Sequence, residues 1–350
     1  MKTLRTATAI TTLGVIAAMM AGCASSAADA TDQGPATELR LGYFANVTHA
    51  PALVGIQEGF LQKELGDTKL STEVFNAGPA AIEALSAGAI DATYIGPNPS
   101  INTFIQSRGE SARVIAGAAT GGAALVVQND ISSPADLAGK TLATPQLGNT
   151  QDVALRGWLK KQGFQTDTSG GGDVTITPTE NAQTFQLFTD GQLDGAWLPE
   201  PWVSRLVVDA DAKVLVDEAD EWPDGQFPTT VLLVRKEFLD QHPETVSKLL
   251  AGHVASVKWL TDNPAEAASV INAQLSADTG KPLSDAVISR ALEHVSFSVD
   301  PHADTFQTLV DNGVAVGTQK PGSISGLFDL RLLNAQLGDA TVSAAGLGEE

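Results

Sequence analysis

The amino-acid sequence predicts an α/β fold of two lobes, each a mixed, mostly parallel sheet flanked by helices, with a ligand cleft between the lobes. The main observation is an internal repeat with an offset of about one hundred residues. The segment GAIDATYIGPNP at 88–99 aligns without a gap with GQLDGAWLPEPW at 191–202. Each half is expected to run strand, helix, strand, helix, strand, helix, an order that favours a parallel sheet with helices on both faces.

Each half supplies three expected strands, and a helix is expected after each of them. The strands of the two halves are expected at 39–44, 71–75 and 92–95, and at 141–145, 174–177 and 196–198. Three more runs of small apolar or β-branched residues predict strands at 113–119, 124–128 and 229–235. After Arg235 the pattern favours helices and no strands, at 243–261, 264–274, 284–293, 303–312 and 324–336.

These elements predict that lobe 2 is inserted into a discontinuous lobe 1. The expected segments are 39–127 and 230–338 for lobe 1, 128–229 for lobe 2 and 339–350 for a loose tail. A hinge is expected where the chain crosses between the lobes, near Val126–Asn129 and Thr229–Val231.

Composition narrows the class of protein. The chain has 350 residues, which fits two domains, and a net charge of −20. This acidic balance argues against binding to nucleic acid or to an anionic membrane surface. The single cysteine excludes a disulfide framework and a zinc-thiolate site. The histidines are scattered, and no GxSxG, P-loop or GxGxxG motif occurs, so we expect no cofactor, no metal and no enzyme activity.

The N-terminus predicts export. Lys2 and Arg5 precede an apolar stretch that ends in small residues, which is typical of a signal peptide over 1–22. The run Met20-Ala21-Gly22-Cys23 resembles a bacterial lipobox, which implies lipidation of Cys23 and anchoring to the outer face of the cell membrane. A plain signal peptide with a chance cysteine is the alternative. Small polar residues over 23–38 predict a flexible tether.

A binding site is expected at the turns that follow the strands of the repeat. In open α/β sheets ligands lie beyond the carboxyl ends of the strands, where helix N-termini attract anions without a cationic side chain. The candidate residues in the first three turns and in the crossing at 120–122 are Asn46, Thr48, His49, Asn98, Ser100, Gly148, Asn149, Thr150, Thr120, Gly121 and Gly122. The fourth turn adds Trp197, Glu200 and Trp202.

Each candidate also has a purely structural alternative. Thr48, Asn98 and Ser100 are residue types that cap helices, and the spacing of Asn149 and Asp152 resembles a capping box. The two tryptophans are residues that usually lie in a core. The glycines of the crossing suit a hinge as well as an anion nest.

Several motifs together resemble the substrate-binding proteins of ABC importers that take aliphatic sulfonates, taurine, nitrate and pyrimidine precursors. The resemblance covers about 39–337. It is carried by the lipobox and by the segments 42–60, 88–97, Ser132–Lys140 (SSPADLAGK), Asp194–Trp197 (DGAW) and Glu200–Trp202 (EPW).

The resemblance implies a type II periplasmic-binding-protein-like clamp that closes on a small organic anion. It also implies delivery of the ligand to a membrane permease with its ATPase, by a protein that acts as a monomer. The segment 120–125, TGGAAL, is most similar to the sulfonate branch, which makes an aliphatic sulfonate the expected ligand. Nitrate, taurine, a thiamine pyrimidine precursor or an enzyme on the same fold are the alternatives. The turn Pro97-Asn98-Pro99 departs from the usual pattern, and Arg205 is the one arginine expected near the cleft.

Overall fold

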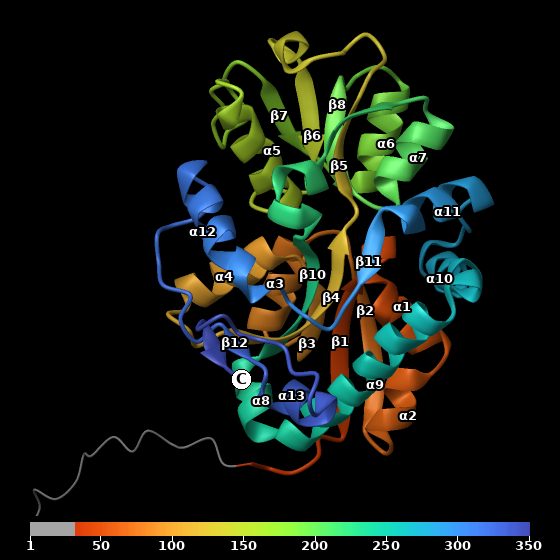
Figure 1. Cartoon of the computed structure of the whole chain (residues 1–350), viewed down its shortest axis with the longest axis vertical. Helices are drawn as coiled ribbons and strands as arrows, with labels where there is room; N and C mark the ends of the chain where they lie inside the picture. Colours follow the sequence, from red (N-terminus) through yellow and green to blue (C-terminus); the bar gives the residue numbers. More distant parts are fainter. Residues whose placement is uncertain (1–31) are drawn as a thin grey trace, which may run out of the picture.

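Two separate sheets lie one above the other along the long axis of the molecule, and each forms the centre of one lobe (Figure 1). The computed structural model describes residues 32–350. Lobe 1 contains an 8-stranded sheet of order β13-β12-β4-β10-β3-β1-β2, with β11 paired to β4, and lobe 2 contains a 5-stranded sheet of order β7-β6-β8-β5-β9. The two-lobed α/β fold predicted from the repeat is therefore confirmed.

The strands of lobe 1 are β1 (Glu38–Phe44), β2 (Lys69–Phe75), β3 (Ala92–Ile95), β4 (Ala112–Gly121), β10 (Pro228–Arg235), β11 (Val295–Phe297), β12 (Phe328–Asp329) and β13 (Gly348–Glu349). Those of lobe 2 are β5 (Ala123–Val127), β6 (Thr141–Thr144), β7 (Thr175–Pro178), β8 (Gly195–Pro199) and β9 (Lys213–Asp217).

The helices that follow the repeat strands are α1 (Ala50–Gln57), α2 (Phe60–Leu65), α3 (Gly78–Ser86) and α4 (Pro97–Gln106) in lobe 1, and α5 (Thr150–Lys161), α6 (Asn181–Thr189) and α7 (Trp202–Asp209) in lobe 2. The C-terminal helices are α8 (Lys236–Gln241), α9 (Pro243–Asp262), α10 (Pro264–Thr279), α11 (Asp285–Glu293), α12 (Phe306–Ala315) and α13 (Arg331–Leu337). Short 3-10 turns are η1 (Val47–His49), η2 (Pro134–Leu137), η3 (Glu218–Glu221), η4 (Pro223–Gly225) and η5 (Ala303–Thr305).

The internal repeat is visible in the strand pairing. In lobe 1 β1 pairs in parallel with β2 and β3, and in lobe 2 β6 pairs in parallel with β7 and β8. Next to these parallel strands each sheet has an antiparallel strand: β10 pairs with β3 in lobe 1, and β5 pairs with β8 in lobe 2. Because parallel strands end at the same edge, the loops after all six repeat strands face the space between the lobes.

The crossings between the lobes lie a few residues from the expected places. Strand β5 pairs with β8 and β9, so strands of lobe 2 begin at Ala123, whereas the sequence analysis placed the start of lobe 2 at 128. The chain changes sheets at Gly121 and Gly122, whose φ angles of 72° and 71° are readily adopted by glycine. The second crossing lies between β9 and β10, over 218–227. The expected hinge segments therefore fall on or beside strands β5 and β10.

The C-terminal part also differs from the expectation. It contains β11, β12 and β13, and helix α13 begins at Arg331 instead of 324. The expected loose tail is packed onto lobe 1, because Ala344 is buried and Leu330 N–H donates to Glu349 O at 2.8 Å. Part of the expected tether is also held, since Ala36 N–H donates to Thr245 Oγ1 at 2.8 Å. The predicted signal peptide and Cys23 lie outside the described residues.

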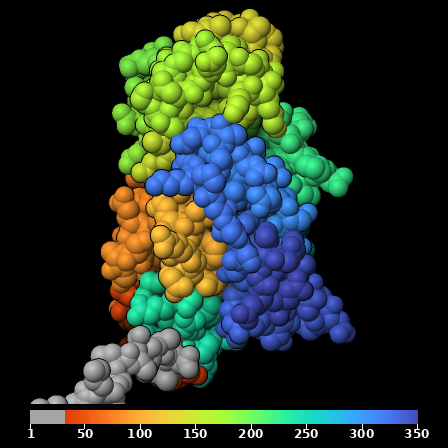
Figure 2. Space-filling view, turned by 90° about the vertical axis from the view of Figure 1, so that its left-hand side faces the viewer, coloured from red at the N-terminus to blue at the C-terminus, as the bar shows by residue number. Residues whose placement is uncertain are grey.

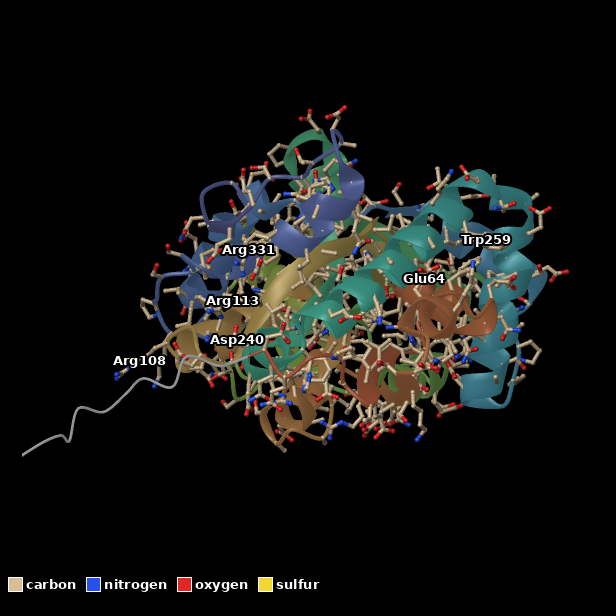
Figure 3. All side chains as sticks on the ribbon, turned by 90° about the horizontal axis from the view of Figure 1, so that it is seen from below. Glu64, Arg108, Arg113, Asp240, Trp259 and Arg331 are labelled. Atoms are coloured by element: carbon tan, nitrogen blue, oxygen red, sulfur yellow. The ribbon has the colours of Figure 1, made fainter. Side chains whose placement is uncertain are left out.

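The C-terminal helices cover lobe 1 and reach the other lobe. Figure 2 shows the segment around 310, in blue, lying directly against lobe 2, and Lys160 Nζ of α5 donates to Ala315 O of α12 at 2.8 Å. The end of lobe 1 that points away from lobe 2 carries both signs of charge, including Glu64, Arg113 and Arg331 (Figure 3). Over residues 32–350, no helix is both long and apolar enough to cross a membrane.

Candidate ligand-binding site between the lobes

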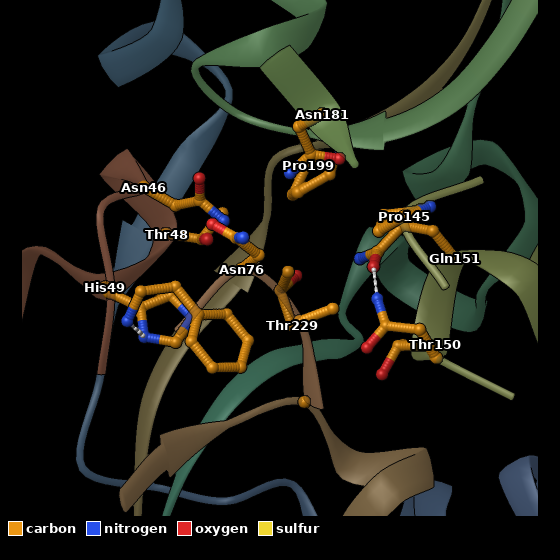
Figure 4. Close-up of a pocket in the computed structure, with 14 residues that line it drawn as sticks. Asn46, Thr48, His49, Asn76, Pro145, Thr150, Gln151, Asn181, Pro199 and Thr229 are labelled. Atoms are coloured by element: carbon orange, nitrogen blue, oxygen red, sulfur yellow. Dashed lines mark hydrogen bonds between the residues drawn. The ribbon is translucent and has the colours of Figure 1, made fainter. Parts of the chain in front are cut away.

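A small cavity lies between the lobes, at the ends of the repeat strands (Figure 4). Its volume is about 20 Å³, which is enough for about one water molecule. No lysine, arginine, aspartate or glutamate is among its lining residues, which are Phe44, Asn46, Thr48, His49, Asn76, Ala77, Gly96, Pro145, Asn149, Thr150, Gln151, Asn181, Pro199 and Thr229. The cavity is therefore polar and uncharged.

Helix N-termini from both lobes lie at this cavity. Lining residues lie at the start of α5 and α6, and immediately before α1, α3 and α4. The N-caps of α3, α4 and α5, which are Ala77, Gly96 and Asn149, make no side-chain cap hydrogen bond. The dipoles of such helices favour a negative charge at their N-termini without a cationic side chain.

The lobes touch each other around the cavity. Asn149 Oδ1 of lobe 2 accepts from Gly78 N–H of lobe 1 at 3.2 Å, and Trp202 Nε1 of lobe 2 donates to Asn46 Oδ1 of lobe 1 at 2.9 Å. A Cβ atom placed on Gly96 of lobe 1 would overlap Thr150 Oγ1 of lobe 2. These contacts define a closed arrangement of the two lobes.

Two lining atoms have no partner among residues 32–350. Thr150 Oγ1 and Asn181 Oδ1 are buried and make no hydrogen bond. Buried polar side-chain atoms in native proteins are rarely left without a partner, so these two atoms suit a polar ligand in the cavity.

His49 contributes a neutral ring. Complete burial lowers its pKa to about 3, so it is uncharged near neutral pH. Phe44 N–H donates to Nδ1 at 3.3 Å, which places the imidazole proton on Nε2 and makes that nitrogen a donor.

Five of the sequence-predicted residues line the cavity, namely Asn46, Thr48, His49, Asn149 and Thr150. The capping-box interpretation of Asn149 and Asp152 is wrong, because the Asn149 side chain makes no cap bond. Asp152 instead accepts from Gly148 N–H at 2.9 Å and forms a buried ion pair with Arg156. Gly148 therefore lies beside Asn149, which lines the cavity, but its own N–H donates to Asp152 within lobe 2.

Other predicted residues make contacts outside this cavity lining. Asn98 Nδ2 donates to Leu309 O at 3.3 Å, and Ser100 Oγ donates to Gly96 O at 3.0 Å within its own helix. Trp197 is buried in lobe 2, and its Nε1 donates to Glu218 Oε2 at 2.7 Å. The core position of Trp197 matches its structural alternative, whereas neither the Asn98 contact nor the Ser100 contact is the expected helix cap.

The crossing and the fourth turn form a second contact between the lobes. Gly121 O accepts from Thr229 Oγ1, Gly122 O accepts from Glu200 N–H at 2.8 Å, and Thr120 is buried in β4. The buried Glu200 carboxylate of lobe 2 accepts from Arg290 Nη1 of α11 at 3.1 Å. Burial raises the pKa of Glu200, while hydrogen bonds from Ser204 and the charge of Arg290 act in the opposite direction. Glu200 thus links the lobes beside the crossing at Gly122.

Four polar lining residues were not predicted from the sequence, namely Asn76, Gln151, Asn181 and Thr229. Asn76 directly follows β2, and Asn181 follows β7 by a few residues, so they occupy related places in the two halves. The rule that ligands lie beyond strand ends applies to these two turns as well, and it could have identified both asparagines. Thr229 lies on β10, outside the repeat, and no sequence signal marked it.

Among residues 32–350 no group of His, Cys, Asp or Glu side chains is arranged to hold a metal ion. The lining side chains offer amides, hydroxyls and one neutral imidazole, with no carboxylate, thiol or amine. This set can hold a polar ligand by hydrogen bonds.

Known proteins share this architecture. A model of the NMT1-like family matches residues 32–275. The taurine-binding periplasmic protein of Escherichia coli K12 is 28% identical over 214 residues, which cover 61% of this chain and 64% of that protein. The bicarbonate-binding protein CmpA of Synechococcus elongatus is 25% identical over 273 residues, which cover 71% of this chain and 59% of that protein.

Among solved structures, the alkanesulfonate-binding protein SsuA from Xanthomonas axonopodis pv. citri, bound to MOPS, matches with a TM-score of 0.68. The identity is 22%, and the match covers 82% of this chain and 95% of that chain. This similarity confirms the fold of a periplasmic binding protein. The family resemblance predicted from the motifs is likewise confirmed, and the relatives are binding proteins found outside the cytoplasm.

Proposed function

Because the chain belongs to the NMT1-like family, we propose that it is the solute-binding component of an ABC importer and that it captures an aliphatic sulfonate between its lobes. The observation that carries the proposal is the uncharged, donor-rich cavity where the two lobes meet. The named specificities of the taurine-binding and alkanesulfonate-binding relatives support a sulfonate.

With a slight separation of the lobes, because the space here is close to that of one water, the cavity suits a sulfonate head group. Its three oxygens share one negative charge and accept several hydrogen bonds, and they bind no proton near neutral pH. The neutral His49 Nε2–H and the Thr150 hydroxyl are donors, and the helix N-termini at the cavity favour an anion. An anion held by neutral donors and dipoles needs no arginine or lysine in contact with it, in agreement with the lining.

Ligand binding is proposed to favour the closed arrangement of the lobes, after which the closed protein delivers its ligand to a permease with its ATPase. Cross-lobe bonds such as Trp202 to Asn46 and Arg290 to Glu200 form in this arrangement. A lipid on Cys23 is proposed to keep the protein, acting as a monomer, at the outer face of the cell membrane.

The test is a thermal-shift and calorimetry panel with the purified full chain. The ligands are methane-, ethane-, propane- and benzenesulfonate, taurine, nitrate, bicarbonate, sulfate and a hydroxymethylpyrimidine. An alkanesulfonate present at a hundred times its dissociation constant is expected to add about 2.7 kcal/mol to the free energy of unfolding. Stabilisation by nitrate, bicarbonate or the pyrimidine alone would overturn the sulfonate and keep the transport role. No stabilisation by any member of the panel would overturn the proposed function.

A further inference from the structure

A second, much larger hollow opens beside the cavity. Its volume is about 830 Å³, within the usual range for small-molecule sites, while the cavity itself holds about one water. Asn46, Asn76 and Asn181 line both spaces, so the groove lies next to the cavity. The groove therefore offers space beside the cavity for the carbon chain of an organic ligand.

Arg205 stands in the groove wall without an acceptor. It lies on α7, and its Cζ is 4.5 Å from the ring centroid of Phe185 and 4.6 Å from that of Trp202. Across residues 32–350 its guanidinium has no hydrogen-bond or ion-pair partner. By contrast, the guanidinium groups of five other arginines pair with carboxylates, namely Arg40, Arg156, Arg235, Arg290 and Arg331.

The position of Arg205 is fixed before any ligand binds. Two aromatic rings hold the guanidinium plane by cation–π contact, and its burial is only partial, so its N–H donors stay available to the groove. Trp202 connects Arg205 to the cavity, because the same indole donates to Asn46 Oδ1. A held guanidinium is suited to bind a carboxylate through two parallel hydrogen bonds.

Two of the three acidic residues of the groove, Glu180 and Asp278, already accept hydrogen bonds. Glu180 accepts from Asn76 Nδ2 at 2.9 Å, and Asp278 Oδ1 accepts from Tyr43 at 2.9 Å and from Gln274 at 2.8 Å. Asp278 Oδ2 has no partner among the described residues, so a ligand amine is the competing occupant. Asp209 lies four residues after Arg205 and forms no ion pair with it over residues 32–350.

We propose that Arg205 forms a second anion subsite, so that the preferred ligand is a short-chain dianion with a sulfonate in the cavity and a carboxylate at Arg205. This inference rests on the proposed function and adds to it a ligand class with acidic groups at both ends. In this proposal the groove holds the carbon chain of the ligand and its distal carboxylate.

The test compares three ligands of one chain length with the full chain, by isothermal titration at low and moderate salt. They are 3-sulfopropanoate, propane-1-sulfonate and 3-aminopropane-1-sulfonate, which end in a carboxylate, a methyl group and an ammonium group. The wild-type chain is expected to bind 3-sulfopropanoate about tenfold more tightly than propane-1-sulfonate, with a ratio that falls as salt rises. Arg205→Gln should bring this ratio close to one, and Arg205→Lys should keep part of it.

Arg113→Gln is the matched control, since Arg113 is also a half-buried arginine over an aromatic ring, Phe104, but lies on lobe 1 outside the groove. It should leave the ratio unchanged. A wild-type ratio near one, or a ratio that Arg205→Gln does not change, overturns the subsite and leaves the sulfonate function standing. Tightest binding of the amine overturns it in favour of Asp278. No binding of any of the three overturns the sulfonate function and the subsite together.

Discussion

Tyr94 in lobe 1 and Trp197 in lobe 2 occupy equivalent positions of the repeat, on β3 and β8. Both rings are fully buried. Each polar tip is bound by a residue outside the repeat: Tyr94 Oη lies 2.9 Å from His253 Nδ1, and Trp197 Nε1 donates to Glu218. The repeated halves therefore supply the same apolar body, and the segments added after them supply different polar partners.

The pKa values of these two partners, His253 and Glu218, are shifted in opposite directions. Burial lowers the pKa of His253 to about 4, while burial raises the pKa of Glu218 to about 7, with the charges of Asp217 and Glu221 adding to that rise. The same physical cause, loss of water around the charged form, keeps a histidine and a glutamate neutral in different pH ranges. Two lobes of one architecture thus respond to pH in opposite directions.

The comparison is tested most strongly by removing each aromatic ring. Trp197→Ala is expected to lower the free energy of unfolding of lobe 2 by about 3–5 kcal/mol, because it leaves a large cavity and removes the donor of Glu218. Tyr94→Ala should act in the same way on lobe 1. Scanning calorimetry would then show the altered lobe melting first, in two resolved transitions.

Trp197→Phe is the control, because it keeps most of the ring volume and removes the indole donor. It should cost clearly less than the alanine variant. A single cooperative transition that moves as a whole in both alanine variants would show that the lobes unfold as one unit, and the separation of the two lobes would be wrong.

Titration of Glu218 and His253 tests this difference between the two lobes. Glu218 has a folded-state pKa of about 7 against an ordinary value of 4.5, so its contribution to stability is complete below pH 4.5 and is lost as pH rises through 7. His253 has a folded-state pKa of about 4 against 6.5, so its contribution is present above pH 6.5 and is lost as pH falls toward 4. Either loss amounts to at most about 3 kcal/mol.

Glu218→Gln is therefore expected to flatten the pH dependence of the lobe 2 transition between 4.5 and 7, since the amide still accepts from Trp197. His253→Gln should flatten that of lobe 1 between 4 and 6.5. Calorimetry across pH 4 to 8 measures both slopes. A lobe 2 slope that persists in Glu218→Gln would assign the titration to another group.

The fold and the candidate site differ in how much of each could be predicted from the sequence, and this difference has a physical reason. Strand β3 was predicted with its bounds, because a short buried strand between Gly88 and Pro97 has strong local signals. The crossing at Gly122 was misplaced, because an apolar run such as Ala123–Val127 has the same composition in either sheet. The tail was misjudged because small residues over 339–350 give no pattern, although Ala344 is buried against lobe 1.

The site was predicted where residues follow repeat strands and missed where a contact depends on the other lobe. Asn46 and Thr150 were identifiable from their turns. The direction of Glu200, toward Arg290 and away from the cavity, depends on helix α11, which lies ninety residues later and carried no signal for this contact. Local sequence marks the ends of strands, whereas which side chain faces which lobe is decided by packing between distant segments.

The turns after β3 and β8 give the smallest and most specific test of the comparison. Gly96 and Pro199 are equivalent in the repeat, and both line the cavity. Only the first has to be glycine, because a Cβ at Gly96 would overlap Thr150 Oγ1 when the lobes are closed. Its backbone is extended, with φ −69° and ψ 155°, so alanine is compatible with lobe 1 by itself.

Gly96→Ala is therefore expected to weaken binding of propane-1-sulfonate about tenfold or more, an overpacking cost of about 1–3 kcal/mol that falls on the closed arrangement. The melting temperature of the unliganded chain should stay within about a degree of the wild type, because the cost is avoided when the lobes separate. Gly157→Ala on α5, where an added Cβ meets nothing within 4 Å, is the matched control: it should leave the affinity unchanged and raise the melting temperature slightly, because alanine favours a helix interior over glycine. Thr150→Ala combined with Gly96→Ala removes the overlapping hydroxyl, so the double variant should lose less than the sum of the two single losses. Additive losses, or a melting temperature that falls together with affinity, would place the effect of Gly96 inside lobe 1 and not at the contact between the lobes.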